Sequence, residues 1–249
     1  MSKIFDALRK AEPGSMDLVS STLETELRQD PVHPRVKRIR DSEFGRLGSA
    51  VLGAFTKSRE GKVVLVVGAV EREGATYVTA NLGRVLAAVG GGSVLGLDAN
   101  FHSPDLGRHL GAKSGLGLAD VMENGHGRDL SDVVQRGDAP NLFVVTPGRT
   151  RGQSTAVFDS PEFEALLSSV RHSFRFTLVD GPPLLTYPDS IHLAARVDGV
   201  ILVVRQGRLR REVLQKAAET MQSVHAPILG AVLNRRRFAI PNFVYKLIS

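Results

Sequence analysis

Four polar positions in this sequence could together bind and position a phosphate group. Gly74-Ala75-Thr76 closes a polar loop that follows the apolar run Val63–Val67, and Asp98, Asp180 and Asn234 each stand at the end of another apolar run. A strand, a glycine-bounded loop and a helix form the frame of a phosphate-binding loop. Mg²⁺ on a bound nucleotide is held by a hydroxyl and one or two carboxylates. These residue types therefore indicate a nucleotide site with a metal ion.

The metal ligands in this interpretation are the hydroxyl of Thr76 and the carboxylates of Asp98 and Asp180. Each aspartate also has a simpler interpretation, because an aspartate that follows a strand can cap the element after it. For a single aspartate at the end of a strand the two interpretations are balanced. Two such aspartates, combined with the loop, favour the metal site.

The loop lacks a residue that phosphate loops use. Such loops contain G-K-[S/T], with backbone N–H groups around the phosphates and a lysine on the β/γ oxygens. Ala75 replaces that lysine, and Arg72 stands where the loop favours a glycine. Arg72 could block the approach of phosphates, or it could provide the missing positive charge. Because a charge-assisted hydrogen bond contributes about 1.5–3 kcal/mol, we expect nucleotide binding to be weak or absent.

The strands that position these residues alternate with helices. Apolar runs predict strands at 63–67, 93–97, 142–145, 176–179, 200–204 and 228–233. Helical patterns between them cover 76–89, 118–122, 130–134, 161–170, 189–195 and 208–224. This alternation predicts the α/β class, with a doubly wound, mostly parallel sheet and right-handed crossovers. Ligands of such sheets bind at the carboxyl ends of the strands. All four polar positions lie at such ends.

The remaining segments predict three parts. Residues 1–12 form a short amphipathic helix for docking, residues 13–41 are a polar, proline-containing linker, and residues 42–249 are the α/β domain. The segment SEFGRLGSAVLGAF opens that domain as a helix, with Phe44, Leu47, Val51 and Leu52 on its inner face.

Composition limits the function classes. With no cysteine among 249 residues there is no disulfide framework and no thiol chemistry, and no apolar run is long enough to cross a bilayer, so we expect a cytoplasmic protein. The net charge of +6 is compatible with nucleic acid, a membrane surface or an acidic partner. Aromatic residues make up 6% and do not interleave with basic ones, so we expect no nucleic-acid platform.

The motifs resemble those of the bacterial tyrosine kinases (BY-kinases) of capsule and exopolysaccharide export, the CpsD/CapB-like group of P-loop proteins with a MinD-like architecture. Residues 43–46 (EFGR) are similar to the start of the family's E-x-x-R-x-x-R oligomerisation helix. The other matching segments are SKIFDALRKAE, VLGLDANFHSP, FTLVDGPPLL, GVILVVRQGRLRREV and GAVLNRRR. VLGLDANFHSP corresponds to L-I-D-x-D-x-R-x-P, and FTLVDGPPLL to I-I-D-x-P-P.

The resemblance implies specific roles for the residues of the site. It implies ATP and Mg²⁺ as cofactors, with Gly74, Ala75, Thr76 and Asn234 on the nucleotide side and Thr76, Asp98 and Asp180 on the metal; the two aspartates are also the implied catalytic residues. The implied partner is the cytoplasmic segment of a membrane polysaccharide co-polymerase, which places the protein at the inner membrane. The helix that carries Glu43 and Arg46 implies a homo-oligomer.

Departures from the family pattern predict a degenerate enzyme. The family's P-G-E-G-K-[S/T] loop reads Glu71-Arg72-Glu73-Gly74-Ala75-Thr76, Asn100 replaces the second acid of its motif, Ser49 replaces an oligomerisation arginine, and the tail holds one tyrosine, Tyr245. We therefore expect a regulator or scaffold with impaired ATP binding and catalysis. Two alternatives remain: an active tyrosine autokinase with an unusual loop, and a ParA/MinD-like positioning ATPase that binds DNA or membrane.

Overall fold

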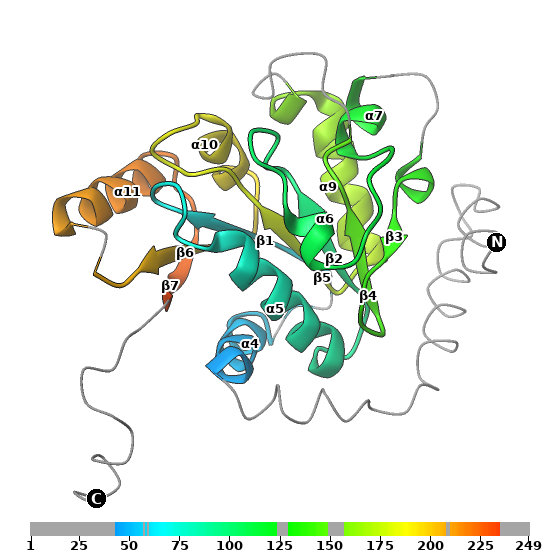
Figure 1. The fold of residues 1–249 in the computed structure, drawn as a ribbon, viewed down its shortest axis with the longest axis horizontal. Coiled ribbons are helices and arrows are strands. Elements are labelled where there is room, and N and C mark those ends of the chain that lie inside the picture. The colour runs from blue at the N-terminus through cyan, green and yellow to red at the C-terminus, as the bar shows by residue number, and fades with distance from the viewer. Residues whose placement is uncertain are drawn as a thin grey trace, which may run out of the picture.

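The chain forms an α/β sandwich in which helices cover both faces of a central sheet (Figure 1). The structure is a computed structural model and describes residues 43–56, 58, 60–123, 129–148, 157–207 and 210–234. The predicted N-terminal helix, the linker and Tyr245 lie outside these residues, and their predicted roles stay predictions. No helix in the described ranges is both long and apolar enough to span a membrane.

Within the described residues the sheet has seven strands in the order β3-β4-β2-β5-β1-β6-β7. Six are mutually parallel, and β3 pairs antiparallel with β4 at one edge. The strands are β1 (Lys62–Gly68), β2 (Val94–Asp98), β3 (Gln135–Arg136), β4 (Leu142–Val145), β5 (Phe176–Asp180), β6 (Gly199–Arg205) and β7 (Ile228–Asn234). This confirms the predicted doubly wound, mostly parallel sheet.

Two apolar layers separate the sheet from its helices. On one face lie α4 (Glu43–Ala54), α5 (Ala75–Val89) and α6 (Leu106–His109), and on the other α7 (Leu118–Glu123), α9 (Pro161–Ser173), α10 (Asp189–Ala194) and α11 (Arg211–Ser223). The side chains of β1 alternate between the two layers, Val63 and Leu65 on the second and Val64 and Val66 on the first. Burial on both faces explains why this run is wholly apolar.

Helix α4 confirms the predicted helix at the start of the domain. Val51 is buried, and Phe44, Leu47 and Leu52 pack against the same apolar layer. Gly48 faces α5 so closely that a Cβ atom there would lie 2.5 Å from Cγ1 of Val85. The absence of a side chain at this position therefore sets the distance between the two helices.

Two described elements were not predicted from the sequence. Helix α6 spans four residues after β2, and β3 is a two-residue strand. A 3-10 turn at Leu130–Asp132 replaces the small helix expected over 130–134. The remaining described strands and helices match their predictions to within a few residues, as is normal for element boundaries.

Candidate phosphate and metal site

The two aspartates predicted for the site lie side by side. Asp98 ends β2 and Asp180 ends the neighbouring β5, and the two residues are register partners in the parallel ladder. β1, which leads into the loop, is the neighbour of β5 on its other side. The sheet topology thus brings both carboxylates to the edge where the loop begins, as the sequence predicted.

Asp98 is buried, and both of its carboxylate oxygens accept backbone N–H groups. Oδ1 accepts from Asn100 N at 3.2 Å, and Oδ2 accepts from Leu106 N at 3.0 Å. These bonds hold the segment after β2 and the start of α6. Burial raises the pKa of Asp98 to about 7, against the lowering effect of the backbone bonds to Asn100 and Leu106. Asp98 therefore does cap the following element, as the simpler interpretation expected.

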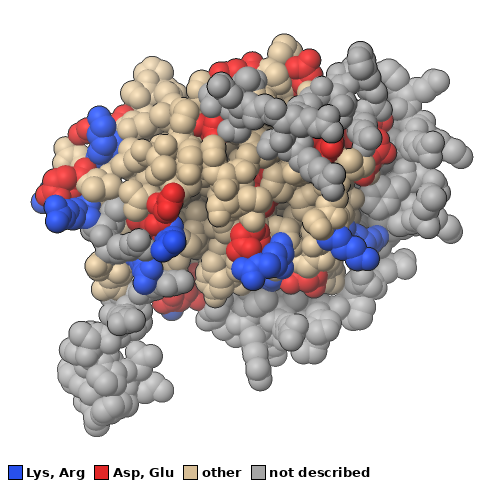
Figure 2. Space-filling view, turned by 45° about the horizontal axis from the view of Figure 1, so that its top comes forward, with Lys and Arg blue, Asp and Glu red and all other residues tan. Residues whose placement is uncertain are grey.

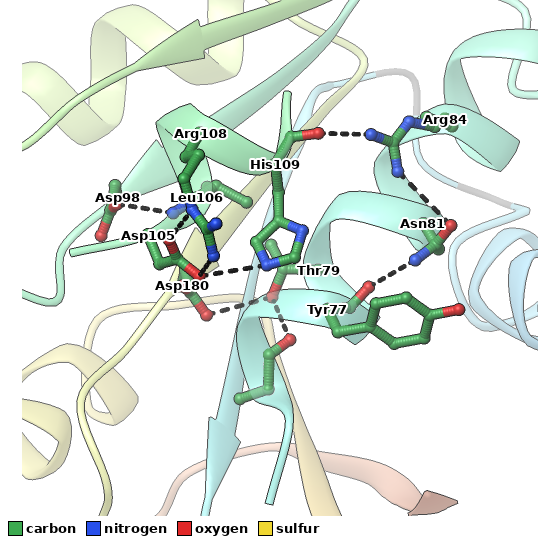
Figure 3. A network of polar contacts seen from close by, with 11 residues as sticks. Tyr77, Thr79, Asn81, Arg84, Asp98, Asp105, Leu106, Arg108, His109 and Asp180 are labelled. Carbon is green, nitrogen blue, oxygen red and sulfur yellow. Dashed lines mark hydrogen bonds and ion pairs between the residues drawn. The ribbon is translucent and has the colours of Figure 1, made fainter. Parts of the chain in front are cut away.

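Asp180 is fully buried, and its two carboxylate oxygens differ in their hydrogen bonds (Figure 3). The hydroxyl of Thr79 lies 3.3 Å from Oδ1, while Oδ2 has no hydrogen-bond partner in the described part of the chain. Burial, and then the charge of Asp98, raise the pKa of Asp180 well above its ordinary value, and the hydroxyls of Thr76 and Thr79 oppose that rise. One buried carboxylate oxygen is thus left for a cation or a proton.

The loop between β1 and α5 is held in place by one of its own side chains and by a side chain of β7. Oε2 of the buried Glu73 accepts Ala69 N at 2.6 Å and Val70 N at 3.2 Å. Nδ2 of Asn234, at the end of β7, donates to the Glu73 carbonyl oxygen at 2.8 Å. Gly74 precedes α5 with φ 89°, a left-handed conformation suited to glycine. The loop therefore keeps its form without a lysine.

Asn234 was expected on the nucleotide side, and in the structure its amide donates to the backbone of the loop. A Cβ atom on Gly74 would lie 2.3 Å from Nδ2 of Asn234. The positive φ of Gly74 disfavours other residues at this position, and a side chain there would displace the Asn234 amide. A direct role of Asn234 toward nucleotide stays a prediction.

Arg72 and Ala75 mark the departures from a working phosphate loop. Arg72 is exposed and adopts φ 63°, so the backbone keeps a conformation that glycine adopts freely and that costs another residue about 1–2 kcal/mol. Ala75 is the first residue of α5, and its methyl group carries no charge. Arg72 thus has a backbone conformation typical of glycine, and position 75 carries no ammonium group.

The residues present fit a magnesium ion better than they fit the phosphates. The Thr76 hydroxyl and the Oδ2 atom of Asp180 are oxygen donors on one side of the loop, with Asp98 beside them. A hydroxyl with one or two carboxylates suits Mg²⁺, which keeps several of its waters. Among the described residues no three His, Cys, Asp or Glu side chains converge as a metal cage. Bound there, Mg²⁺ would neutralise phosphate charge, with Thr76, Asp98 and Asp180 holding it.

One pair at this edge was not identified from the sequence. Nε2 of His102, in the segment after β2, lies 2.6 Å from Oδ2 of the buried Asp189 at the start of α10. The His102 ring stacks on Tyr187, with the ring centres 3.7 Å apart. The pair ties the segment after Asp98 to the segment after Asp180. A signal existed, since His102 stands at the arginine position of L-I-D-x-D-x-R-x-P.

Sequence comparison identifies named relatives of this chain. The tyrosine-protein kinase CpsD of Streptococcus agalactiae is 26% identical over 178 residues, covering 71% of this chain and 76% of the relative. The chain is related to the CpsD-type bacterial tyrosine kinases. The putative tyrosine-protein kinase EpsB of Ralstonia solanacearum is 29% identical over 172 residues, which cover 69% of this chain and 22% of EpsB. No family model matches the chain.

Solved structures confirm the P-loop fold. The VpsO kinase domain superposes with a TM-score of 0.70 at 24% identity, covering 82% of this chain and 97% of that domain. The cell-division ATPase MinD of Pyrococcus furiosus superposes with a TM-score of 0.60 at 22% identity, covering 76% and 79%. At these identities the structures establish the fold alone. The predicted roles of the individual site residues stay predictions.

Proposed function

We propose that this protein is a CpsD-like regulator of capsule or exopolysaccharide assembly whose phosphoryl-transfer chemistry is impaired. The observation that carries the proposal is the loop itself: its backbone is kept, and Ala75 stands where the phosphate-binding lysine belongs. Phosphoryl transfer depends almost wholly on positioning and on charge stabilisation. Loss of one donor of that kind typically lowers the rate ~10²–10³-fold.

The proposed partner is the cytoplasmic segment of a membrane polysaccharide co-polymerase, which would place the protein at the inner face of the membrane. Support comes from the relation to the CpsD-type kinases and from α4, whose Glu43 and Arg46 side chains are exposed on the outside of the domain. The same helix is the proposed contact between copies of this chain. The N-terminal segment 2–12 is a second proposed contact surface, on the strength of its sequence pattern.

An active tyrosine autokinase is the second candidate. It is favoured by the retained acid pair and by the buried Oδ2 atom of Asp180, which suit a metal-bound nucleotide. A MinD-like positioning ATPase fits less well, since it needs the same lysine. Figure 2 also shows acidic and basic side chains interspersed on the visible face rather than a continuous basic surface for DNA.

The experiment that tests the proposed role compares two variants in the host. Asp180→Asn removes a site carboxylate while keeping its shape, and a triple change of Ile4, Phe5 and Leu8 to Ser removes the apolar stripe of the N-terminal segment. We expect polysaccharide output to be almost unchanged by the first and impaired by the second, at equal protein levels. Output that is lost with Asp180→Asn and unaffected by the triple change would show that the site is required for function and that the scaffold proposal is wrong.

A further inference from the structure

We propose that Arg72 supplies the positive charge that Ala75 no longer provides, so that the residual affinity of the loop for nucleoside di- and triphosphates depends on this guanidinium. The inference rests on the proposed function and deepens it, because it assigns a binding residue to the same loop.

The backbone of Arg72 is held in a conformation that its side chain disfavours. Its φ of 63° lies in the left-handed region, as does the φ of 89° at Gly74. Glycine would adopt such a conformation without cost. A non-glycine residue kept in this region marks a position where the surrounding structure, or a function, demands it.

The Arg72 guanidinium is available for a ligand. It is exposed, and it makes no hydrogen bond or ion pair with the residues that the structure describes. Other basic groups near the acid pair are engaged: Arg108 pairs with Asp105 at 2.6 Å, and His102 with Asp189. Arg72 is also the one basic residue of the loop sequence between β1 and α5.

Independent features at the carboxyl ends of the strands and at the start of α5 point to a metal-bound phosphate. The buried Oδ2 atom of Asp180 has no partner among the described residues, and its carboxylate faces Thr79 in the second turn of α5 (Figure 3). An unsatisfied buried carboxylate oxygen favours a cation, and the N-terminal amides of the 15-residue α5 favour an anion. A phosphate complexed to Mg²⁺ satisfies both, and the guanidinium of Arg72 would contact its outer oxygens.

The opposite interpretation, that the Arg72 side chain obstructs the phosphates, makes a contrary prediction for one variant. Arg72→Gly removes the guanidinium and also relieves the left-handed strain. If Arg72 binds phosphate, the glycine variant is more stable than the wild type and binds nucleotide more weakly. If Arg72 obstructs, the glycine variant is more stable and binds more tightly. The two interpretations therefore predict opposite changes in nucleotide affinity for Arg72→Gly relative to the wild type.

The test is calorimetric titration of the full chain with Mg-ADP at millimolar concentrations. We expect Arg72→Gly and Arg72→Ala to weaken binding about tenfold or more, and Arg72→Lys to keep most of it. Lys113→Ala removes another exposed cation, whose backbone bonds to Gln135 remain, and should bind as the wild type does. In an Ala75→Lys background, replacement of Arg72 should weaken Mg-ADP binding clearly less than it does in the wild type.

Each alternative result decides the matter. If Arg72→Gly binds Mg-ADP as tightly as the wild type or more tightly, the assignment of Arg72 is wrong. The assignment is also wrong if the wild type shows no binding while Ala75→Lys binds. Neither result contradicts the proposed function, since both leave the loop impaired. Low-micromolar binding by the wild type that does not depend on Arg72 would contradict the proposed function as well.

Discussion

Asp98 and Asp180 are register partners on neighbouring strands, yet their oxygens are engaged differently. Both oxygens of Asp98 accept backbone amides, so this residue holds the segment that follows β2 whether or not a metal binds. Asp180 has one buried oxygen with no partner in the described residues. Asp98 therefore caps the segment after β2, and Asp180 offers this oxygen to a cation; the metal role of both residues stays a prediction. Substitution of Asp180 tests a ligand, and substitution of Asp98 tests the fold as well.

The raised pKa of Asp98 predicts a measurable pH dependence of stability. Because folding raises this pKa from 3.8 to about 7, the folded chain keeps a proton that the unfolded chain releases between these values. The contribution to stability is fully present below about pH 4 and is lost as the pH rises through 7. We expect the unfolding free energy to fall with rising pH by up to about 1.4 kcal/mol per pH unit from this group.

The measurement is urea unfolding at pH values from 5 to 8. Asp98→Asn should flatten this slope, and exposed Glu212→Gln should leave it unchanged. The slope is the readout because asparagine has one acceptor oxygen for two amides and lowers stability at every pH. An unaltered slope in Asp98→Asn would contradict the assignment of the proton to this residue.

The loop between β1 and α5 and the helix α4 illustrate how elements position the candidate site. The Glu73 carboxylate and the Asn234 amide hold the loop from inside and from β7. Close packing of α4 on α5 at Gly48 then sets where the exposed Glu43 and Arg46 lie. The proposed binding surface on α4 thus depends on the packing of Gly48 against α5.

Two glycines of α4 provide a matched test of that packing. A methyl group at Gly48 would meet Val85 at 2.5 Å, a branched side chain that cannot yield cheaply, whereas nothing lies within 4 Å of a methyl group at Gly53. Gly53→Ala should stabilise the chain by about 0.5–1 kcal/mol through helix propensity. Gly48→Ala should destabilise it by roughly 1–2 kcal/mol, because overpacking outweighs that gain. Chemical denaturation measures both, and equal effects would contradict the packing model.

Sequence patterns predicted the elements that are long and uniformly buried. Runs such as Val63–Val67 are apolar because both of their faces are covered, so the strands and the strand-end positions of Asp98 and Asp180 followed. Helix α6 and strand β3 are too short to show a period, and they depend on tertiary contacts such as the Asp98 carboxylate on Leu106 N. The roles of Glu73 and of the His102–Asp189 pair need distances that no spacing in the sequence supplies.

At the scale of the whole molecule, the residues that form the core differ from the loop residues that would bind phosphate. The buried residues of the two apolar layers include neither Ala75 nor Arg72, and the partly buried Ala75 packs against the outside of one layer. The structures of the VpsO kinase domain and of MinD show the same fold. Three of the departures from the family motifs, at Arg72, Ala75 and Asn100, lie in the loop and in the segment after β2. A fold that is kept without its lysine is consistent with a role in which other chains recognise its surface.

The last prediction follows from this separation: the protein will not phosphorylate its own tyrosines. The chain has three, of which Tyr77 is exposed on α5, Tyr187 stacks on His102, and Tyr245 lies outside the described residues. Incubation with labelled ATP and Mg²⁺, with and without the cytoplasmic segment of a candidate co-polymerase, should leave all three unlabelled, while an active CpsD assayed in parallel becomes labelled. Impaired charge stabilisation at Ala75 is the physical reason. Label that disappears in Tyr245→Phe would refute the prediction, and label that appears only in Ala75→Lys would show that the missing lysine alone silences the site.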